Sequence, residues 1–220
     1  WPEARPAKTM PCYDRLNAAG AVWGAVYGWE IPLWFAPEGC EAKDTWSYRT
    51  FNSMPHIGAE CRAVRETAGL FEMTPMAKFE VSGPGAEVWL NRILANRMPR
   101  KIGGIVLAHL LTHKGTIRCE FTVTRLGETS FYLVGTPRGE RHDFDVLQKT
   151  LPADGTVTLI NVTAERGGLT LVGPKARDIL QDLVDGDLGN DAFPWMSAQA
   201  LTVGLASDVR MMRINYEGEL

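Results

Sequence analysis

Residues 79–86 read Phe79-Glu80-Val81-Ser82-Gly83-Pro84-Gly85-Ala86, and this stretch decides the fold. Alternation over residues 78–82 predicts a strand. An amphipathic helix is expected over residues 86–94, with the proline near its first turn, where a missing N–H costs little. The pattern returns 90 positions later as Leu171-Val172-Gly173-Pro174-Lys175-Ala176. The repeat predicts two similar halves, each built of a strand, a Gly-Pro turn and a helix.

The rest of the chain completes an α+β fold of antiparallel sheets with packed helices. Between the two copies, residues 105–111, 117–125 and 131–135 predict three strands of an antiparallel meander joined by short turns. Periodicity predicts further helices and strands. The helices are expected at residues 13–20, within 58–71 with an end near Gly69, and at 138–149; the strands are expected at 157–161 and 169–172.

Composition and charge exclude several classes of protein. The chain has 220 residues, of which 45% are hydrophobic and 22% charged, as in ordinary globular proteins. The formal net charge of −3 gives no positive field to attract phosphate backbones. No apolar run approaches the roughly 18 residues that a membrane helix needs. We therefore expect neither a nucleic acid nor a membrane as partner.

Cysteine usage bears on the compartment. The 4 cysteines are scattered and show no CxxC spacing, whereas small secreted proteins normally carry a denser disulfide framework. The first residues, Trp1-Pro2-Glu3-Ala4-Arg5-Pro6, lack the apolar core of a signal peptide. A reducing, cytoplasmic location fits these features best.

The first 55 residues differ from the rest in composition. They include Trp1, Trp23, Trp29, Trp34 and Trp46, while periodicity is weak after residue 20. These rings are expected either to anchor an extended arm on a missing partner surface or to pack on the core of this chain. We assign residues 1–55 to a linker or arm and residues 56–220 to a folded domain that is truncated at its C-terminus, and we interpret the chain as a fragment.

Signatures of known catalytic chemistry are absent. The sequence has no GxSxG elbow, no GxxxxGK[ST] phosphate loop and no HExxH pair. His109 and His113 are four apart but fall on a predicted strand and its turn, where this spacing does not bring them together, so no metal site is predicted. His142-Asp143 is interpreted as a surface pair. Cys119 could have a perturbed thiol, but a buried structural cysteine is the favoured interpretation.

One carboxylate interrupts a strand. Glu120 lies within the apolar alternation of residues 117–123, on the face opposite Ile117, Cys119, Phe121 and Val123. A solvated strand face would give this pattern, and so would a functional site, so the pattern alone does not distinguish them. Glu219, near a turn at the end of the chain, is uninformative by itself.

Several motifs resemble the folate-binding T-protein (aminomethyltransferase) family of the glycine cleavage system. They are Gly58–Glu66 followed by Gly69-Leu70-Phe71, the stretch Phe79–Ala86, the strand Gly115–Arg125, and Tyr216-Glu217-Gly218-Glu219, which is similar to the start of the family's YxGExGxE motif. The resemblance covers essentially the whole chain. It is closest to the C-terminal half of dimethylglycine and sarcosine dehydrogenases or oxidases, in which a flavin domain precedes the folate domain.

The resemblance implies a function and a set of site residues. Tetrahydrofolate would accept a one-carbon unit from an iminium that the flavin half makes from an N-methyl amine, which yields 5,10-methylenetetrahydrofolate. FAD would bind only in a domain outside this chain, fused or associated. Glu120 corresponds to the catalytic carboxylate of the family, and Glu219, with Tyr216 in the same motif, to its pterin-binding glutamate.

Two departures from the family keep alternatives open. Glu120 stands where the family usually has Asp, and Thr136 stands where glycine-cleavage members usually place an Asn in contact with the substrate. An added methylene moves the charge by roughly 1 Å, and such misplacement can cost about 10²-fold in rate. The alternatives are a non-catalytic folate-binding or scaffold domain, and a folate-dependent demethylase of another methyl donor.

Overall fold

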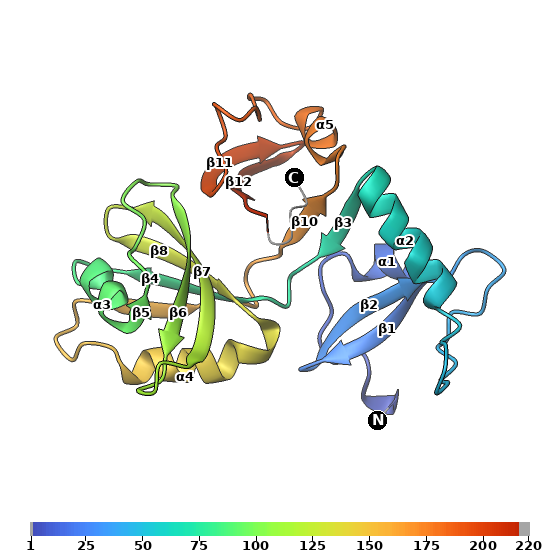
Figure 1. Ribbon diagram of the computed structural model, residues 1–220, viewed down its shortest axis with the longest axis horizontal. Coiled ribbons are helices and arrows are strands. Elements are labelled where there is room, and N and C mark those ends of the chain that lie inside the picture. The colour runs from blue at the N-terminus through green and yellow to red at the C-terminus, as the bar shows by residue number, and fades with distance from the viewer. Residues whose placement is uncertain (1, 216–220) are drawn as a thin grey trace. The chain divides into compact units, whose positions relative to one another are not determined.

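The computed structural model describes residues 2–215 and divides into two compact units (Figure 1). One unit consists of residues up to Pro75 together with Gly167–Ala176. The other contains Met76–Arg166 and continues from Arg177. The predicted boundary between residues 1–55 and 56–220 concerns the organisation of the whole protein and stays a prediction.

A six-stranded antiparallel sheet forms the centre of the second unit. Its strands lie in the order β5-β6-β7-β8-β4-β9. The predicted meander is present as β6, β7 and β8, each paired with the next along the chain. The bounds are β4 Ala77–Ser82, β5 Leu94–Ala95, β6 Ile105–Leu111, β7 Ile117–Gly127, β8 Ser130–Gly135 and β9 Thr158–Asn161.

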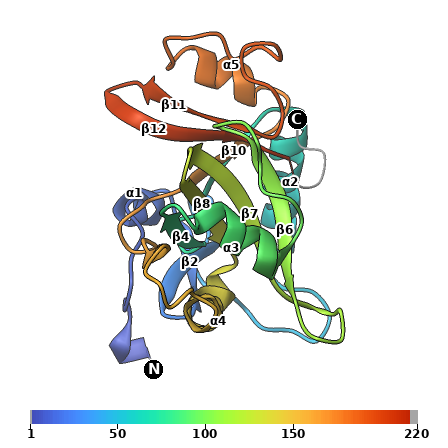
Figure 2. The ribbon, with the colours of Figure 1, turned by 90° about the vertical axis from the view of Figure 1, so that its left-hand side faces the viewer.

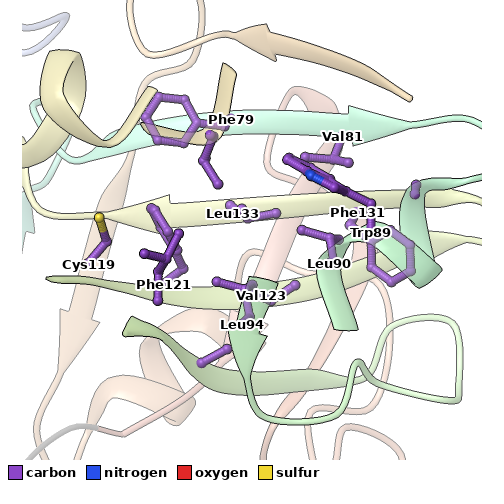
Figure 3. Close-up of a cluster of buried hydrophobic side chains, with 14 of the residues drawn as sticks. Phe79, Val81, Trp89, Leu90, Leu94, Cys119, Phe121, Val123, Phe131 and Leu133 are labelled. Carbon is purple, nitrogen blue, oxygen red and sulfur yellow. The ribbon is translucent and has the colours of Figure 1, made fainter. Parts of the chain in front are cut away.

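The hydrophobic core lies on one face of this sheet. Side chains that alternate along β4, β7 and β8 meet there and are fully buried, among them Phe79, Phe121 and Leu133 (Figure 3). The helices α3 (Ala86–Ile93) and α4 (Glu140–Lys149) contribute Leu90 and Leu147 to the same cluster. A short 3-10 helix at Pro137–Gly139 precedes α4. Both helices lie on this face (Figure 2), so the opposite face of the sheet carries neither.

The two Gly-Pro turns repeat in atomic detail. Gly83 and Gly173 both have positive φ angles, +118° and +109°, and each carbonyl accepts a hydrogen bond of 3.0 Å from the N–H three residues on. α3 and α5 (Ala176–Gln181) begin at those residues. The prediction of two similar strand–Gly-Pro–helix halves is therefore confirmed.

The second unit also contains a hairpin that the sequence did not predict. β11 (Ser197–Val203) pairs with β12 (Ala206–Arg213), and Gly104, just before β6, bridges to Ser197. Val184, Leu188 and Phe193 form a small buried cluster beside it. This hairpin brings Arg210 to the large sheet, where the arginine takes part in the site described below.

The first unit is built around a second hairpin, again unpredicted. β1 (Ala21–Val26) pairs with β2 (Trp29–Phe35), after the predicted helix α1 (Tyr13–Ala18) and a 3-10 turn at Pro2–Ala4. Trp29 and Trp34 are buried within this unit, and Trp34 donates its indole N–H to Asp44 at 2.8 Å. These two rings thus pack on the chain's own core, whereas Trp46 is exposed.

The helix predicted within residues 58–71 is wrong at both ends. α2 spans Met54–Glu66, because Pro55 suits the first turn of a helix, where its missing N–H has no partner to lose. Gly69 does not end the helix. It begins strand β3 (Gly69–Glu72), which pairs with β10 (Leu169–Val172).

The α+β fold class with antiparallel sheets and packed helices is confirmed. Among the described residues, no helix is both long and apolar enough to cross a membrane.

Candidate functional site

The helix-free face of the six-stranded sheet carries most of the polar side chains of its central strands. Directly opposed residues in antiparallel strands point to the same side. The pairs His109↔Glu120, Thr124↔Tyr132 and Tyr132↔Glu80 therefore place these side chains on one face. We call this set, His109, Glu120, Thr122, Thr124, Tyr132 and Glu80, the polar face.

Glu120 lies at one end of the polar face and is bound to a histidine. His109 Nε2 lies 2.6 Å from Glu120 Oε2, and the two side chains are 26% and 35% exposed. Within the part of the chain that the structure describes, His109 is the hydrogen-bond partner of this carboxylate. Glu120 is therefore a half-buried, singly bonded carboxylate and not a freely solvated side chain.

Thr136 follows directly after the end of β8 at Gly135, at the end of the sheet where Glu120 lies in β7. The printed strand pairs end at Thr122 and Val134, and extension of this register by two residues would bring Thr136 opposite Glu120. A Cβ built on Gly135 would lie 3.5 Å from the backbone oxygen of Glu120, which agrees with this placement. Thr136 is exposed. Glu219 and Tyr216, the predicted pterin-binding residues, lie outside the described residues.

The other end of the polar face is positively charged. The guanidinium of Arg210 stacks 4.1 Å from the ring centroid of Tyr132 and lies 3.7 Å from Glu80 Oε1, which Arg166 also contacts at 3.5 Å. Burial raises the pKa of Tyr132 above its usual value, so its hydroxyl stays protonated at neutral pH. Two cations thus share one carboxylate beside a neutral phenol.

Thr124 lies between these two ends. Its side chain is fully buried, and within the described part of the chain its hydroxyl has no hydrogen-bond partner. An unpaired buried hydroxyl costs about 1–3 kcal/mol and is rare in native proteins without bound water or another unseen partner.

A second cluster lies on the core side of β7. Donor atoms of Cys119, His142 and Asp143 lie within 4.8 Å of one another, close enough to consider a metal ion. However, burial raises the pKa of Cys119 to about 12, and a hydrogen bond to Asp143 adds to the shift. A metal-bound cysteine must be a thiolate, so this shift opposes metal binding. The predicted absence of a metal site stays a prediction.

Sequence reasoning missed two functional candidates. For His109 the sequence offers only the four-residue spacing to His113. The short predicted turn between residues 111 and 117 indicates that the two strands pair, but it does not fix the register that sets His109 opposite Glu120. Arg210 could not be found in this way, because it reaches the sheet through the unpredicted hairpin β11–β12.

Comparison with known proteins gives one family. The model for the GCVT N-terminal domain matches residues 12–220. Dimethylglycine dehydrogenase from Rattus norvegicus is 32% identical over 98% of this chain and 25% of its own length. The pyruvate dehydrogenase phosphatase regulatory subunit from Mus musculus is 29% identical over the same shares. The chain therefore spans about a quarter of the length of these relatives.

A solved structure agrees with the family model. The glycine cleavage system aminomethyltransferase T from Bartonella henselae has a TM-score of 0.74 and 30% sequence identity to this chain. The match covers 97% of this chain and 52% of that one.

Proposed function

The chain belongs to the GCVT N-terminal domain family, as its motifs predicted, and from this premise we propose that it is a folate-dependent one-carbon transfer domain. The whole protein would be an enzyme of the dimethylglycine or sarcosine dehydrogenase type. The observation that carries the proposal is the carboxylate of Glu120, half-buried on the polar face and bonded to His109.

The side chains of the polar face suit tetrahydrofolate in chemical type. A pterin ring presents neighbouring N–H and amino donors, which match a two-oxygen carboxylate, and its glutamate tail is anionic. The face offers Glu120 as acceptor, the neutral hydroxyl of Tyr132 and the guanidinium of Arg210. Bound tetrahydrofolate would supply the nitrogen that accepts the one-carbon unit. Glu219, Tyr216 and Thr136 complete the proposed binding set.

The role proposed for Glu120 is electrostatic. A carboxylate fixed in a partly desolvated position lowers the energy of positive charge that develops near it. The proposed substrate, an iminium derived from an N-methyl amine, is such a cation. Glu120 would hold it and orient the attacking nitrogen. Tetrahydrofolate would form two C–N bonds to the carbon, the bond from that carbon to the amine nitrogen would break, and the demethylated amine would leave with one of the two folate N–H protons. The other proton would pass to solvent, and 5,10-methylenetetrahydrofolate would be the product.

The proposal also implies a flavin partner. Oxidation of an N-methyl amine to an iminium needs an electron acceptor, which we propose to be FAD in an oxidoreductase domain outside this chain, fused or associated. The rat relative is named a dehydrogenase and is four times as long as the matched region. This supports oxidation in one domain and one-carbon transfer in another. The small-molecule partners are then the amine-derived iminium and folate.

Replacement of Glu120 tests this proposal. In the full-length protein we expect Glu120→Ala to lower coupled formation of 5,10-methylenetetrahydrofolate at least about 100-fold and to leave amine oxidation unchanged. The control is Glu128→Ala, which removes an exposed glutamate at the turn after β7. Undiminished coupling in Glu120→Ala would remove Glu120 from the reaction.

A second candidate is a regulatory or scaffold domain without transfer chemistry. It is favoured by the similarity to a protein whose name is that of a phosphatase regulatory subunit. Calorimetry measures whether tetrahydrofolate binds, and an assay of methylenetetrahydrofolate measures whether transfer occurs, so the two measurements together separate the two functions. Saturable binding by a wild-type protein that forms no methylenetetrahydrofolate would favour the second candidate.

The cytoplasm remains our proposed location. The 4 free cysteines, of which Cys40 and Cys61 are exposed, support a reducing compartment. Several relatives are named as mitochondrial proteins, and that description is theirs.

A further inference from the structure

The contact between His109 and Glu120 follows from the architecture of one hairpin. β6 and β7 pair over residues 105–111 and 117–124, and this register sets His109 directly opposite Glu120. On the other side of β6, His109 faces Ala95 of β5. The Ala95 side chain is a single methyl group and cannot form a hydrogen bond to the imidazole. The hydrogen-bond partner of the imidazole lies on the β7 side and is the Glu120 carboxylate.

The bond uses one oxygen of the carboxylate. His109 Nε2 lies 2.6 Å from Oε2, and within residues 2–215 no hydrogen bond to Oε1 is recorded. A carboxylate without a proton only accepts hydrogen bonds, so Glu120 in that form pairs with the tautomer of His109 that carries a proton on Nε2. The arrangement holds one oxygen in place and leaves the other available to a ligand.

A glutamate needs such a restraint more than an aspartate does. Its side chain has one more rotatable bond, and ordering a long side chain costs up to about 1.5–2 kcal/mol of rotamer entropy. A carboxylate that stabilises a developing charge must be held within about 0.5 Å of its working position. Glu120 stands where the family usually has Asp, so its longer side chain has to be restrained. A neighbouring hydrogen-bond donor can supply that restraint.

We propose that His109 is a positioning residue for Glu120, whose Nε2–H holds Oε2 so that Oε1 faces the bound substrate. The proposal rests on the function proposed above for Glu120. It assigns His109 no direct contact with substrate, and its effect on the reaction passes entirely through the carboxylate.

Kinetics of the full-length protein test this role. His109→Ala should lower the rate of coupled methylenetetrahydrofolate formation by about 10–100-fold at saturating tetrahydrofolate, with a much smaller change in KM. His109→Gln should restore most of the rate, because its amide N–H has a similar reach. His113→Ala, an exposed histidine of the same hairpin, is the matched control and should behave as wild type.

A double variant tests whether the effect passes through Glu120. In a Glu120→Ala background, His109→Ala should cause no further loss. An unchanged rate in His109→Ala would overturn the proposal. So would an equal loss in His109→Ala and His109→Gln, or an additive loss in the double variant, since each would show a role independent of the hydrogen bond.

Crystal structures of the same variants separate this proposal from the proposed function. In His109→Ala the Glu120 side chain should occupy more than one rotamer, whereas in His109→Gln it should keep the wild-type one. A single wild-type rotamer in both overturns the positioning role, whatever the kinetics. If Glu120→Ala retains full coupling, the proposed function of Glu120 fails, and the rotamers still decide whether His109 positions it.

Discussion

Cys119 and Glu120 are neighbours in the sequence but lie on opposite faces of β7. Glu120 faces the polar side, and Cys119 is buried in the core side, where its thiol bonds to the buried carboxylate of Asp143. Burial is the larger cause of the rise in the Cys119 pKa to about 12. The thiol of a folded molecule therefore stays protonated under conditions in which an unfolded chain would lose the proton.

This shift predicts a dependence of stability on pH. The folded pKa is raised above the unfolded value of about 9, so the contribution is complete below pH 9 and is lost as pH rises toward 12. The free energy of unfolding should fall by up to about 1.4 kcal/mol per pH unit in this window. Urea unfolding between pH 8 and pH 11 measures it.

A matched variant isolates the contribution of this thiol. Cys119→Ser keeps a donor for Asp143 but does not titrate in this range, so other groups, Tyr132 included, cancel in the comparison. The difference in stability between wild type and Cys119→Ser should shrink as pH rises above 9. Parallel curves for the two proteins would contradict the prediction.

At the scale of single residues, the sequence could rank candidates but could not pair them. The alternation around Glu120 predicted its face correctly, because a strand has only two sides. Its partnership with His109 depends on the register, which shifts by one residue at Leu110/Leu111 near the turn. A register that contains such an irregularity cannot be derived from hydrophobic pattern alone.

The Gly-Pro turns are the elements in which sequence and structure are most tightly linked. At Gly83 an added Cβ would lie 2.3 Å from the backbone oxygen of Thr156, and at Gly173 it would lie 2.6 Å from that of Val64. The Val64 oxygen belongs to helix α2. The Thr156 oxygen lies just before β9 and accepts a hydrogen bond of 3.1 Å from the N–H of Gly85, so a shift of this oxygen would disturb the turn itself. Each glycine therefore meets both a conformational and a steric requirement.

We predict that Gly83→Ala destabilises the protein more than Gly115→Ala does. Gly115 also has a positive φ, +78°, but nothing lies within 4 Å of its added Cβ, so it isolates the backbone cost of about 1–2 kcal/mol. The clash at Gly83 should add about 1–3 kcal/mol. Chemical unfolding of both variants measures the difference, and equal losses would show that the backbone of Thr156 yields.

Elements with a strong local pattern were predicted well, and those that depend on distant partners were not. The meander, α3 and α4 follow from periodicity because each buries one face of its own against the core. β1, β2, β11 and β12 were missed. In β1 and β2 buried and exposed residues do not alternate strictly, and β12 buries no residue fully. Phe71 was assigned to a helix because β3 is defined only by pairing with β10, about 100 residues later.

At the scale of the whole molecule, the two units differ in how well they bury their apolar residues. The core of the six-stranded sheet is fully enclosed at Phe79, Phe121 and Phe131. The β3–β10 pair has two strands, and Leu70 and Leu169 are 64% and 58% exposed. A two-stranded pair with exposed apolar side chains is marginally stable without further packing.

Hydrogen exchange of this chain should therefore be strongly uneven. We expect amides of β3 and β10 to exchange at least about 100-fold faster than those of β4, β7 and β8, because they open locally and not by global unfolding. The β1–β2 pair is the internal control. It also has two strands, but its own residues Trp29 and Trp34 are buried, so its protection should be intermediate. Equal protection of β3–β10 and β4–β8 would mean that the two units unfold as one cooperative body. In that case the exposed leucines would contribute nothing to local instability.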